Sequence, residues 1–200
     1  MTVMDKSGLI EIVAKFVKKL LKDELDPHLY FHNENHTRYV VDAVLEIGKN
    51  TDLTEEELIV VQIAAWFHDV GYTKKYKGHE EVSIIIAQQF LKELKIDLVF
   101  INSVVSCIAA TAYPQAPKNK MEMVICDADF YHLARQDYNK FESALRLEWE
   151  EFLHIVYQDQ EWNQMNLNML TSHTYCTAYG KEKLQILKAI NIRKLLKKIH

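Results

Sequence analysis

The sequence is short of the residues that make turns. Its 200 residues include five glycines and three prolines, where average usage gives about fourteen and about ten. Scarce turn residues favour long elements, and apolar residues recur at helical spacing almost throughout. We therefore expect an all-α protein that forms, at this length, a single domain over residues 1–200.

Cysteine is scarce as well. The three cysteines, Cys107, Cys126 and Cys176, are odd in number and far apart along the chain. None belongs to a CxxC pair of the kind that holds zinc or performs thiol exchange. The sequence thus predicts free thiols in a reducing compartment, and we expect a cytoplasmic protein.

The chain also lacks a strong charge of one sign and a long hydrophobic run. A net charge of −4 and a pI near 6.1 leave no overall positive field to attract nucleic acid or an anionic membrane. The longest apolar stretch, residues 58–67, is interrupted by Gln62 and is too short to span a bilayer. We expect no membrane or nucleic-acid partner, so a phosphate-bearing ligand has to be held by local groups.

The apolar spacing and the capping residues together predict nine helices. We place them near residues 7–23, 36–49, 55–69, 79–95, 98–110, 120–134, 138–157, 161–170 and 178–198. Thr54, with a glutamate three residues on, forms a capping box before an apolar run, and Asn119 makes a similar start. Asp97 and Asp137 are predicted to cap two further helices.

Four polar side chains fall on the apolar faces of these helices. His36 opens one helix and faces inward with the apolar residues that follow it. His68 lies on the apolar stripe of the next helix, Asp69 follows it directly, and Asp127 points inward on a third. Taken alone, each is more often a hydrogen-bonded core residue. Together, two imidazoles and two carboxylates supply the ligands of one divalent cation, which would offset the cost of burying them.

The order of these residues resembles the H…HD…D signature of the HD-domain metal-dependent phosphohydrolase superfamily. The signature is carried by His36, by the pair in AAWFHDVGY and by the aspartate in ICDADF. YFHNENHTRYVVDAV also resembles the YHNxxHT opening of a bacterial branch, and KGHEEVSIIIA resembles its HExxS segment. The resemblance covers a signature core of about residues 30–135 and leaves 136–200 as a C-terminal helical extension.

The resemblance implies a helical bundle in which His36, His68, Asp69 and Asp127 coordinate one divalent metal ion (Mn, Fe, Co, Ni, Zn or Mg). It implies hydrolysis of a phosphomonoester or phosphodiester in a nucleotide or a similar small metabolite. The chemistry agrees, because a bound cation lowers the pKa of a coordinated water and polarises a phosphoryl oxygen. Asp69 either orients that water or only binds the metal. The alternative is a non-catalytic metal- and nucleotide-binding sensor or protein-interaction module.

Neighbouring residues are predicted to complete a phosphate site. Arg38 lies near a helix start, which favours anions, Lys77 lies in the loop after the HD pair, and Thr111 stands where other branches supply further histidines. The alternatives are solvated surface charges and a hydrogen bond at a helix end. One of His79 and Glu80 is predicted to donate or relay a proton, unless Glu80 merely complements the helix N-terminus.

The positions of the histidines limit the number of metal ions that the site is predicted to hold. No histidine occurs between His79 and His132, which favours one metal ion and argues against the cyclic-dinucleotide HD-GYP branch. His32, Asp129 and His173 are weaker candidates that we expect to be structural or exposed. The sequence leaves the oligomeric state open, a homodimer included.

Overall fold

The computed structural model describes residues 6–199 and is helical without strands over that range. Its α-helices are α1 (Lys6–Glu24), α2 (Glu34–Lys49), α3 (Glu55–Phe67), α4 (His79–Glu93), α5 (Leu98–Ala110), α6 (Lys120–Asp129), α7 (Tyr138–Leu153), α8 (Asp159–Ser172) and α9 (Gln185–Ile199). Two short 3₁₀ helices, η1 (Val70–Thr73) and η2 (Phe130–Ala134), follow α3 and α6, and a π-helical turn, η3 (Gly180–Leu184), precedes α9. The predicted all-α fold is confirmed. No helix of the described range is both long enough and apolar enough to cross a bilayer.

Most of the predicted helix starts form as expected. Thr54 makes the full capping box at the start of α3, and the Asp97 and Asn119 side chains accept the amide three residues on, at 2.9 Å and 3.1 Å. The cap predicted at Asp137 is wrong. Its carboxylate makes no cap hydrogen bond and instead accepts from the Arg135 guanidinium at 2.9 Å and 3.3 Å, because that stronger, charged donor is two residues away.

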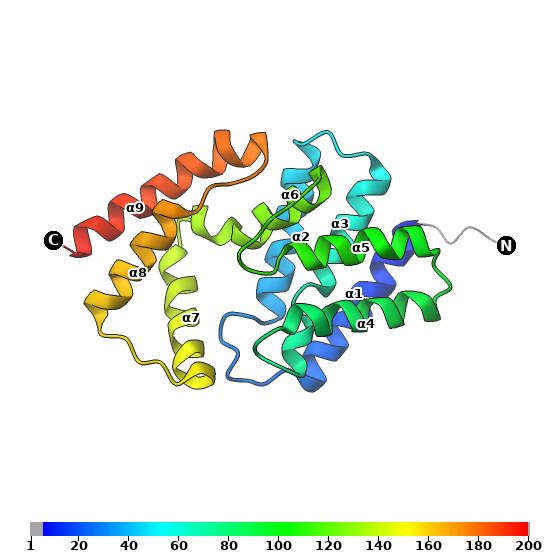
Figure 1. Cartoon of the computed structure of the whole chain (residues 1–200), viewed down its shortest axis with the longest axis horizontal. Helices are drawn as coiled ribbons and strands as arrows, with labels where there is room; N and C mark the ends of the chain where they lie inside the picture. The colour runs from blue at the N-terminus through cyan, green and yellow to red at the C-terminus, as the bar shows by residue number, and fades with distance from the viewer. Residues whose placement is uncertain (1–5, 200) are drawn as a thin grey trace.

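The first part of the molecule, α1 to α6, is built around α3. Helices α1, α2, α5 and α6 all pack against α3, and every residue of α3 from Val60 to Phe67 is buried. A helix that is hydrophobic on all sides belongs in the middle of a core. Figure 1 shows this part on the right, with α3 among its neighbours and α4 beside α5. The central helix therefore delivers the residues that follow it, His68 and Asp69, into the interior.

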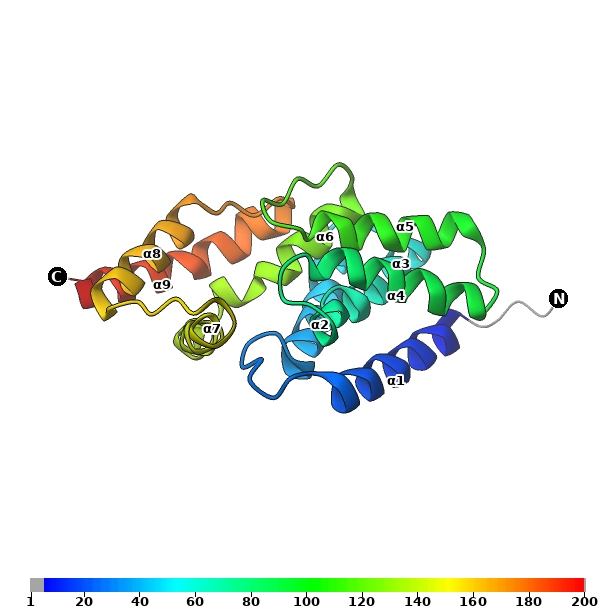
Figure 2. The same cartoon turned by 60° about the horizontal axis from the view of Figure 1, so that its bottom comes forward.

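The second part, α7 to α9, lies at the other end of the long axis (Figures 1 and 2). A small apolar cluster joins it to η2 and is made by Leu133, Tyr138, Leu170 and Leu195. Helix α9 packs on α8 and on η2, so the short helix after α6 is the link between the two parts. Figure 2 shows α7 nearly end-on below α8 and α9.

Candidate metal centre

Three of the predicted ligands meet where α2 begins and α3 ends. His36, His68 and Asp69 are buried, and one possible ligand atom from each lies within 4.8 Å of the others. His36 lies in the first turn of α2, which Asn33 caps by accepting the His36 amide at 3.4 Å. His68 and Asp69 occupy the break between α3 and η1. Two helix ends therefore hold three of the four predicted ligands together.

The distances within this group fit a divalent cation. Asp69 Oδ2 lies 3.1 Å from His68 Nε2 and 3.4 Å from His36 Nε2, and the two Nε2 atoms are 3.4 Å apart. Ligands held about 2.1 Å from one ion in tetrahedral or octahedral geometry lie about 3.0 to 3.4 Å from one another. Asp69 Oδ2 is also buried with no hydrogen-bond partner among the described residues. A buried polar atom without such a partner requires an explanation, which a cation provides.

The surroundings of His68 direct one nitrogen toward the group. Its Nδ1 lies 2.8 Å from the Ala65 carbonyl oxygen, so Nδ1–H donates there and Nε2 is left for a metal. Burial lowers the pKa of His68, but Asp69 and Asp129 raise it more, to about 9 in the metal-free protein. Metal binding would therefore release a proton. Burial raises the pKa of Asp69, yet the charge of His68 brings it well below its usual value, so this carboxylate is ionised.

The structure does not bring Asp127 to this group, and its role as a metal ligand stays a prediction. Its carboxylate accepts hydrogen bonds from the Cys176 amide at 2.6 Å, the Thr177 amide at 2.9 Å and the Thr177 hydroxyl at 2.7 Å. Asp127 is buried, as its position on α6 indicates. The groups that donate hydrogen bonds to it come from the segment before α9. Helical spacing within α6 does not predict contacts with a segment so far along the chain.

Asp129 lies where Asp127 was expected. Its Oδ1 is 3.4 Å from His36 Nε2 and 3.8 Å from His68 Nε2. Two residues turn a helix by about 200°, so the two aspartates leave α6 on opposite sides. Sequence reasoning ranked Asp129 among the weaker candidates. The sequence feature that could have identified Asp129 is its position at the end of a helix, since functional side chains concentrate at helix ends.

The structure brings His79 and Glu80 to the edge of the group. His79 Nε2 lies 3.3 Å from Asp69 Oδ1, and His79 Nδ1 lies 3.6 Å from Glu80 Oε2. The start of α4 comes this close because Gly71 has no side chain: a Cβ there would lie 1.9 Å from the His79 carbonyl oxygen. The Gly71 amide also donates to Ser83 Oγ at 2.8 Å.

The three residues predicted to contact phosphate lie outside the histidine and aspartate group. Arg38 and Lys77 are exposed. The Thr111 hydroxyl donates to the Ile108 carbonyl at 2.8 Å within its own helix end, which is the alternative stated for it above. Contact of Arg38, Lys77 and Thr111 with substrate stays a prediction.

Two residues next to the group were missed. The Tyr72 ring is stacked between two imidazoles, His32 at 4.3 Å and His79 at 3.8 Å between ring centroids. His32 in turn binds Glu148, a buried residue of α7. Tyr72 follows the HD pair closely, so proximity in sequence was an available signal. Glu148 has none, because 116 residues separate it from His32.

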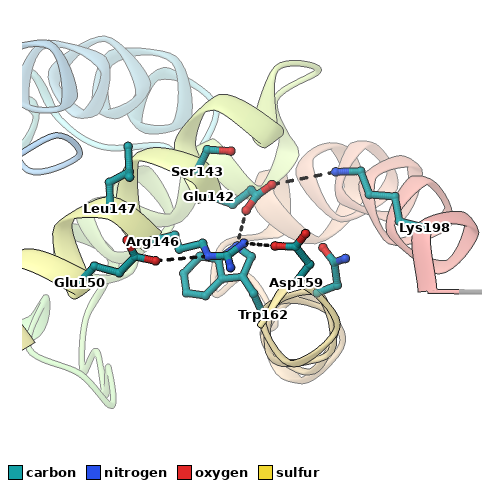
Figure 3. A pocket seen from close by; sticks show the side chains of 9 residues that line it. Glu142, Ser143, Arg146, Leu147, Glu150, Asp159, Trp162 and Lys198 are labelled. Carbon is teal, nitrogen blue, oxygen red and sulfur yellow. Dashed lines mark hydrogen bonds and ion pairs between the residues drawn. The ribbon is translucent and has the colours of Figure 1, made fainter. Parts of the chain in front are cut away.

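A groove of about 590 Å³ lies away from the metal ligands, between α7, α8 and α9 (Figure 3). Arg146 lies within it, paired with Glu150 at 3.6 Å and Asp159 at 2.8 Å, and with its guanidinium carbon 5.8 Å from the centroid of the Trp162 ring. Arg146 is therefore already paired with two carboxylates. We therefore assign the candidate metal centre to the histidine and aspartate group.

Comparison with known proteins gives two findings. The family model described as HD domain matches residues 33–190, which includes α7, α8 and the start of α9. The crystal structure of Bacillus subtilis YpgQ in complex with ADP is similar, with a TM-score of 0.63 and 18% identity over 93% of this chain and 97% of that chain. At this identity the likeness shows the fold alone. No curated protein matches the chain.

Proposed function

The chain belongs to the HD-domain family, and from this premise we propose that it is a metal-dependent phosphohydrolase. The observation that carries the proposal is the spacing of four buried or half-buried ligand atoms from His36, His68, Asp69 and Asp129. Imidazole nitrogens and carboxylate oxygens at such distances are ligands for a first-row divalent cation. Asp129 replaces Asp127 in the set that we propose.

The protein's own side chains would orient the attacking water and move the protons. When bound, a divalent cation supplies a coordinated water of lowered pKa and polarises a phosphoryl oxygen. Asp69 turns Oδ2 toward the histidines and Oδ1 toward His79, so it can accept a hydrogen bond from the attacking water while it binds the metal. We propose that His79 gives a proton to the leaving oxygen and that its ring is oriented by the Tyr76 carbonyl, 3.3 Å from Nδ1, with Glu80 beside the same nitrogen at 3.6 Å.

We propose a nucleotide or a similar small phosphorylated metabolite as the substrate. The support is that the similar structure, YpgQ, was solved in complex with ADP. Arg38 and Lys77 offer exposed cations for phosphate oxygens, and Thr111 offers a hydroxyl if it leaves its helix-end bond. With a net charge of −4, recognition of an anion has to come from such local groups.

The test is to purify the protein with its native metal, measure the bound ions and assay a panel of nucleoside mono-, di- and triphosphates and cyclic phosphodiesters. His68→Ala and Asp69→Ala should lose the metal and at least about a hundredfold in kcat/KM. Hydrolysis that survives both substitutions would place the activity elsewhere. A metal-loaded protein that is inert on the whole panel would favour the sensor or interaction module.

A further inference from the structure

Glu148 of α7 is a fully buried carboxylate on which four hydrogen-bond donors converge. It accepts from the backbone amides of Phe31 at 2.9 Å and His32 at 3.0 Å, and from the Tyr76 hydroxyl at 2.9 Å. It also binds His32 Nδ1. Among the side chains that the structure describes, residues 8–199, no lysine or arginine lies within ion-pair distance of it. Histidine is therefore its ionisable partner, and that histidine lies beside the metal ligands.

The charge of His32 and the hydrogen bonds from residues 31–32 keep this carboxylate ionised despite its burial. Burial raises the pKa of Glu148, but the charge of His32 and the bonds from His32 and Phe31 lower it more, so the net shift is downward. A buried charge is costly unless it is paired and hydrogen-bonded. Glu148 meets both conditions through one short segment, residues 31–32, which leads into α2.

Because Glu148 occupies Nδ1 of His32, the nitrogen that faces the site is Nε2. This atom lies 3.3 Å from the Tyr72 hydroxyl, and the His32 ring lies 5.8 Å from the His36 ring between centroids. Tyr72 is stacked on His32 and on His79. The His32 side chain is 17% exposed, whereas that of Glu148 is 0% exposed. His32 therefore stands between a buried anchor and the accessible edge of the metal centre.

We propose that Glu148 is a positioning residue for the hydrolysis proposed above, holding His32 so that its Nε2 and the Tyr72 hydroxyl contact the substrate phosphate. The inference rests on the proposed function, because it requires a phosphate next to the metal ligands. It extends the site beyond the signature core, since Glu148 comes from the second part of the molecule. The role is defined by which nitrogen of His32 is occupied, and this can be measured directly.

The competing explanation is that Glu148 only fastens the loop before α2 onto α7. Tyr76→Phe separates the two, because it removes one of the four hydrogen bonds to Glu148 and leaves the His32 bond in place. The aromatic ring at position 76 would keep its stacking on Phe152, at 4.9 Å. Glu151→Gln is the matched control, since Glu151 is an exposed residue of the same helix.

The first measurement is the nitrogen NMR spectrum of the histidine rings, with the His32 signal assigned by its loss in His32→Asn. In the wild-type protein Nδ1 of His32 should be protonated, and its signals should shift when inorganic phosphate is added to the metal-loaded protein. Glu148→Gln should lose the fixed Nδ1 proton and the phosphate response, because an amide can either donate to or accept from Nδ1. Tyr76→Phe and Glu151→Gln should keep both.

The second measurement is kinetic, on the phosphoester that the panel identifies. Glu148→Gln should lower kcat/KM about 10- to 100-fold at unchanged metal content, with Glu151→Gln at the wild-type value. The inference is overturned if Glu148→Gln behaves like Glu151→Gln, or if Tyr76→Phe alters the His32 signals as much as Glu148→Gln does. If the wild-type protein hydrolyses nothing, the proposed function fails, and the phosphate response of His32 still decides whether Glu148 positions it.

Discussion

Asp127 and Asp129 are separated by one alanine and leave α6 in different directions. Asp127 binds the backbone and hydroxyl groups that precede α9, while Asp129 faces His36 and His68. Burial alone does not identify a ligand, because Asp127 is fully buried yet binds Thr177 rather than the two histidines. The atoms that each carboxylate contacts distinguish the two residues.

Substituting each aspartate by asparagine tests this division. We expect Asp129→Asn to weaken Mn²⁺ binding at least about tenfold, a loss of about 1.4 kcal/mol, because a neutral amide replaces a charged ligand. Asp127→Asn should bind Mn²⁺ as the wild-type protein does and lose about 1 to 3 kcal/mol of stability, since one acceptor oxygen becomes a donor facing other donors. Calorimetric titration and urea unfolding give the two numbers. The opposite pattern of metal affinity would restore Asp127 as the ligand.

Lys188 is a fully buried lysine whose neighbours include no carboxylate within ion-pair distance in the described chain. Its ammonium donates to the His173 carbonyl and lies 3.3 Å from His173 Nδ1, and it is 5.4 Å from the centroid of the Tyr175 ring. Burial lowers its pKa to about 8. Unfolded, the side chain titrates near 10.5. Between these values the unfolded chain binds more protons, so stability should rise with pH from about 8 to 10.5.

Replacing this lysine should therefore stabilise the protein. We expect Lys188→Met to raise the free energy of unfolding at pH 7 by about 1 to 3 kcal/mol, because the desolvated charge is removed at similar volume. The rise in stability between about pH 8 and 10.5 should disappear as well. Urea unfolding at several pH values measures both effects. If Lys188→Met is no more stable than the wild-type protein and keeps its pH dependence, then the contacts with His173 and Tyr175 offset the cost of burying the ammonium.

At the scale of elements, the start of α9 is fixed by the residue that the sequence suggested as a metal ligand. Asp127 holds Thr177, and the Thr177 hydroxyl in turn accepts the Gly180 amide at 2.9 Å. The π-helical turn begins at Gly180. A Cβ at that position would lie 2.4 Å from Asp127 Oδ2 and 2.7 Å from Tyr175 Cβ. No side chain fits there without displacing the carboxylate or the chain.

Gly180→Ala should consequently loosen the junction between the two parts. We expect a loss of about 1 to 3 kcal/mol from overpacking, with faster amide hydrogen exchange across residues 175–190. Mn²⁺ affinity should be retained, because the proposed metal ligands lie on α2, α6 and the end of α3. Gly8→Ala is a useful control, since nothing lies within 4 Å of a Cβ at that position. Unchanged exchange across residues 175–190 would contradict this description of the junction.

Local sequence patterns predicted which segments are helical better than they predicted where each helix ends and which residues it contacts. The capping box at Thr54 and the cap at Asp97 gave correct helix starts, because a cap and the amide that donates to it lie three residues apart. The stretch expected as one helix over 120–134 becomes α6 and then 3₁₀ from Phe130, and Asp129 is the last residue before that change. Glu148 lies far along the chain from His32, so local spacing contains no information about their contact.

At the scale of the whole molecule, the proposed site draws on both parts. The first part supplies the proposed metal ligands and His79, and the second supplies Glu148 through α7. The family match extends to residue 190 and so includes α7. We therefore propose that residues 1–200 act as one functional domain rather than as a core with an independent appendage.

The central claim is that one divalent ion is held by His36, His68, Asp69 and Asp129. The most direct test is an anomalous difference map from crystals of the Mn²⁺-loaded protein. We expect one strong peak about 2.0 to 2.2 Å from the Nε2 atoms of both histidines and from Oδ2 of Asp69 and Oδ1 of Asp129, with Asp127 still bound to Thr177. A peak coordinated by Asp127, or no peak among these four residues, would contradict the claim.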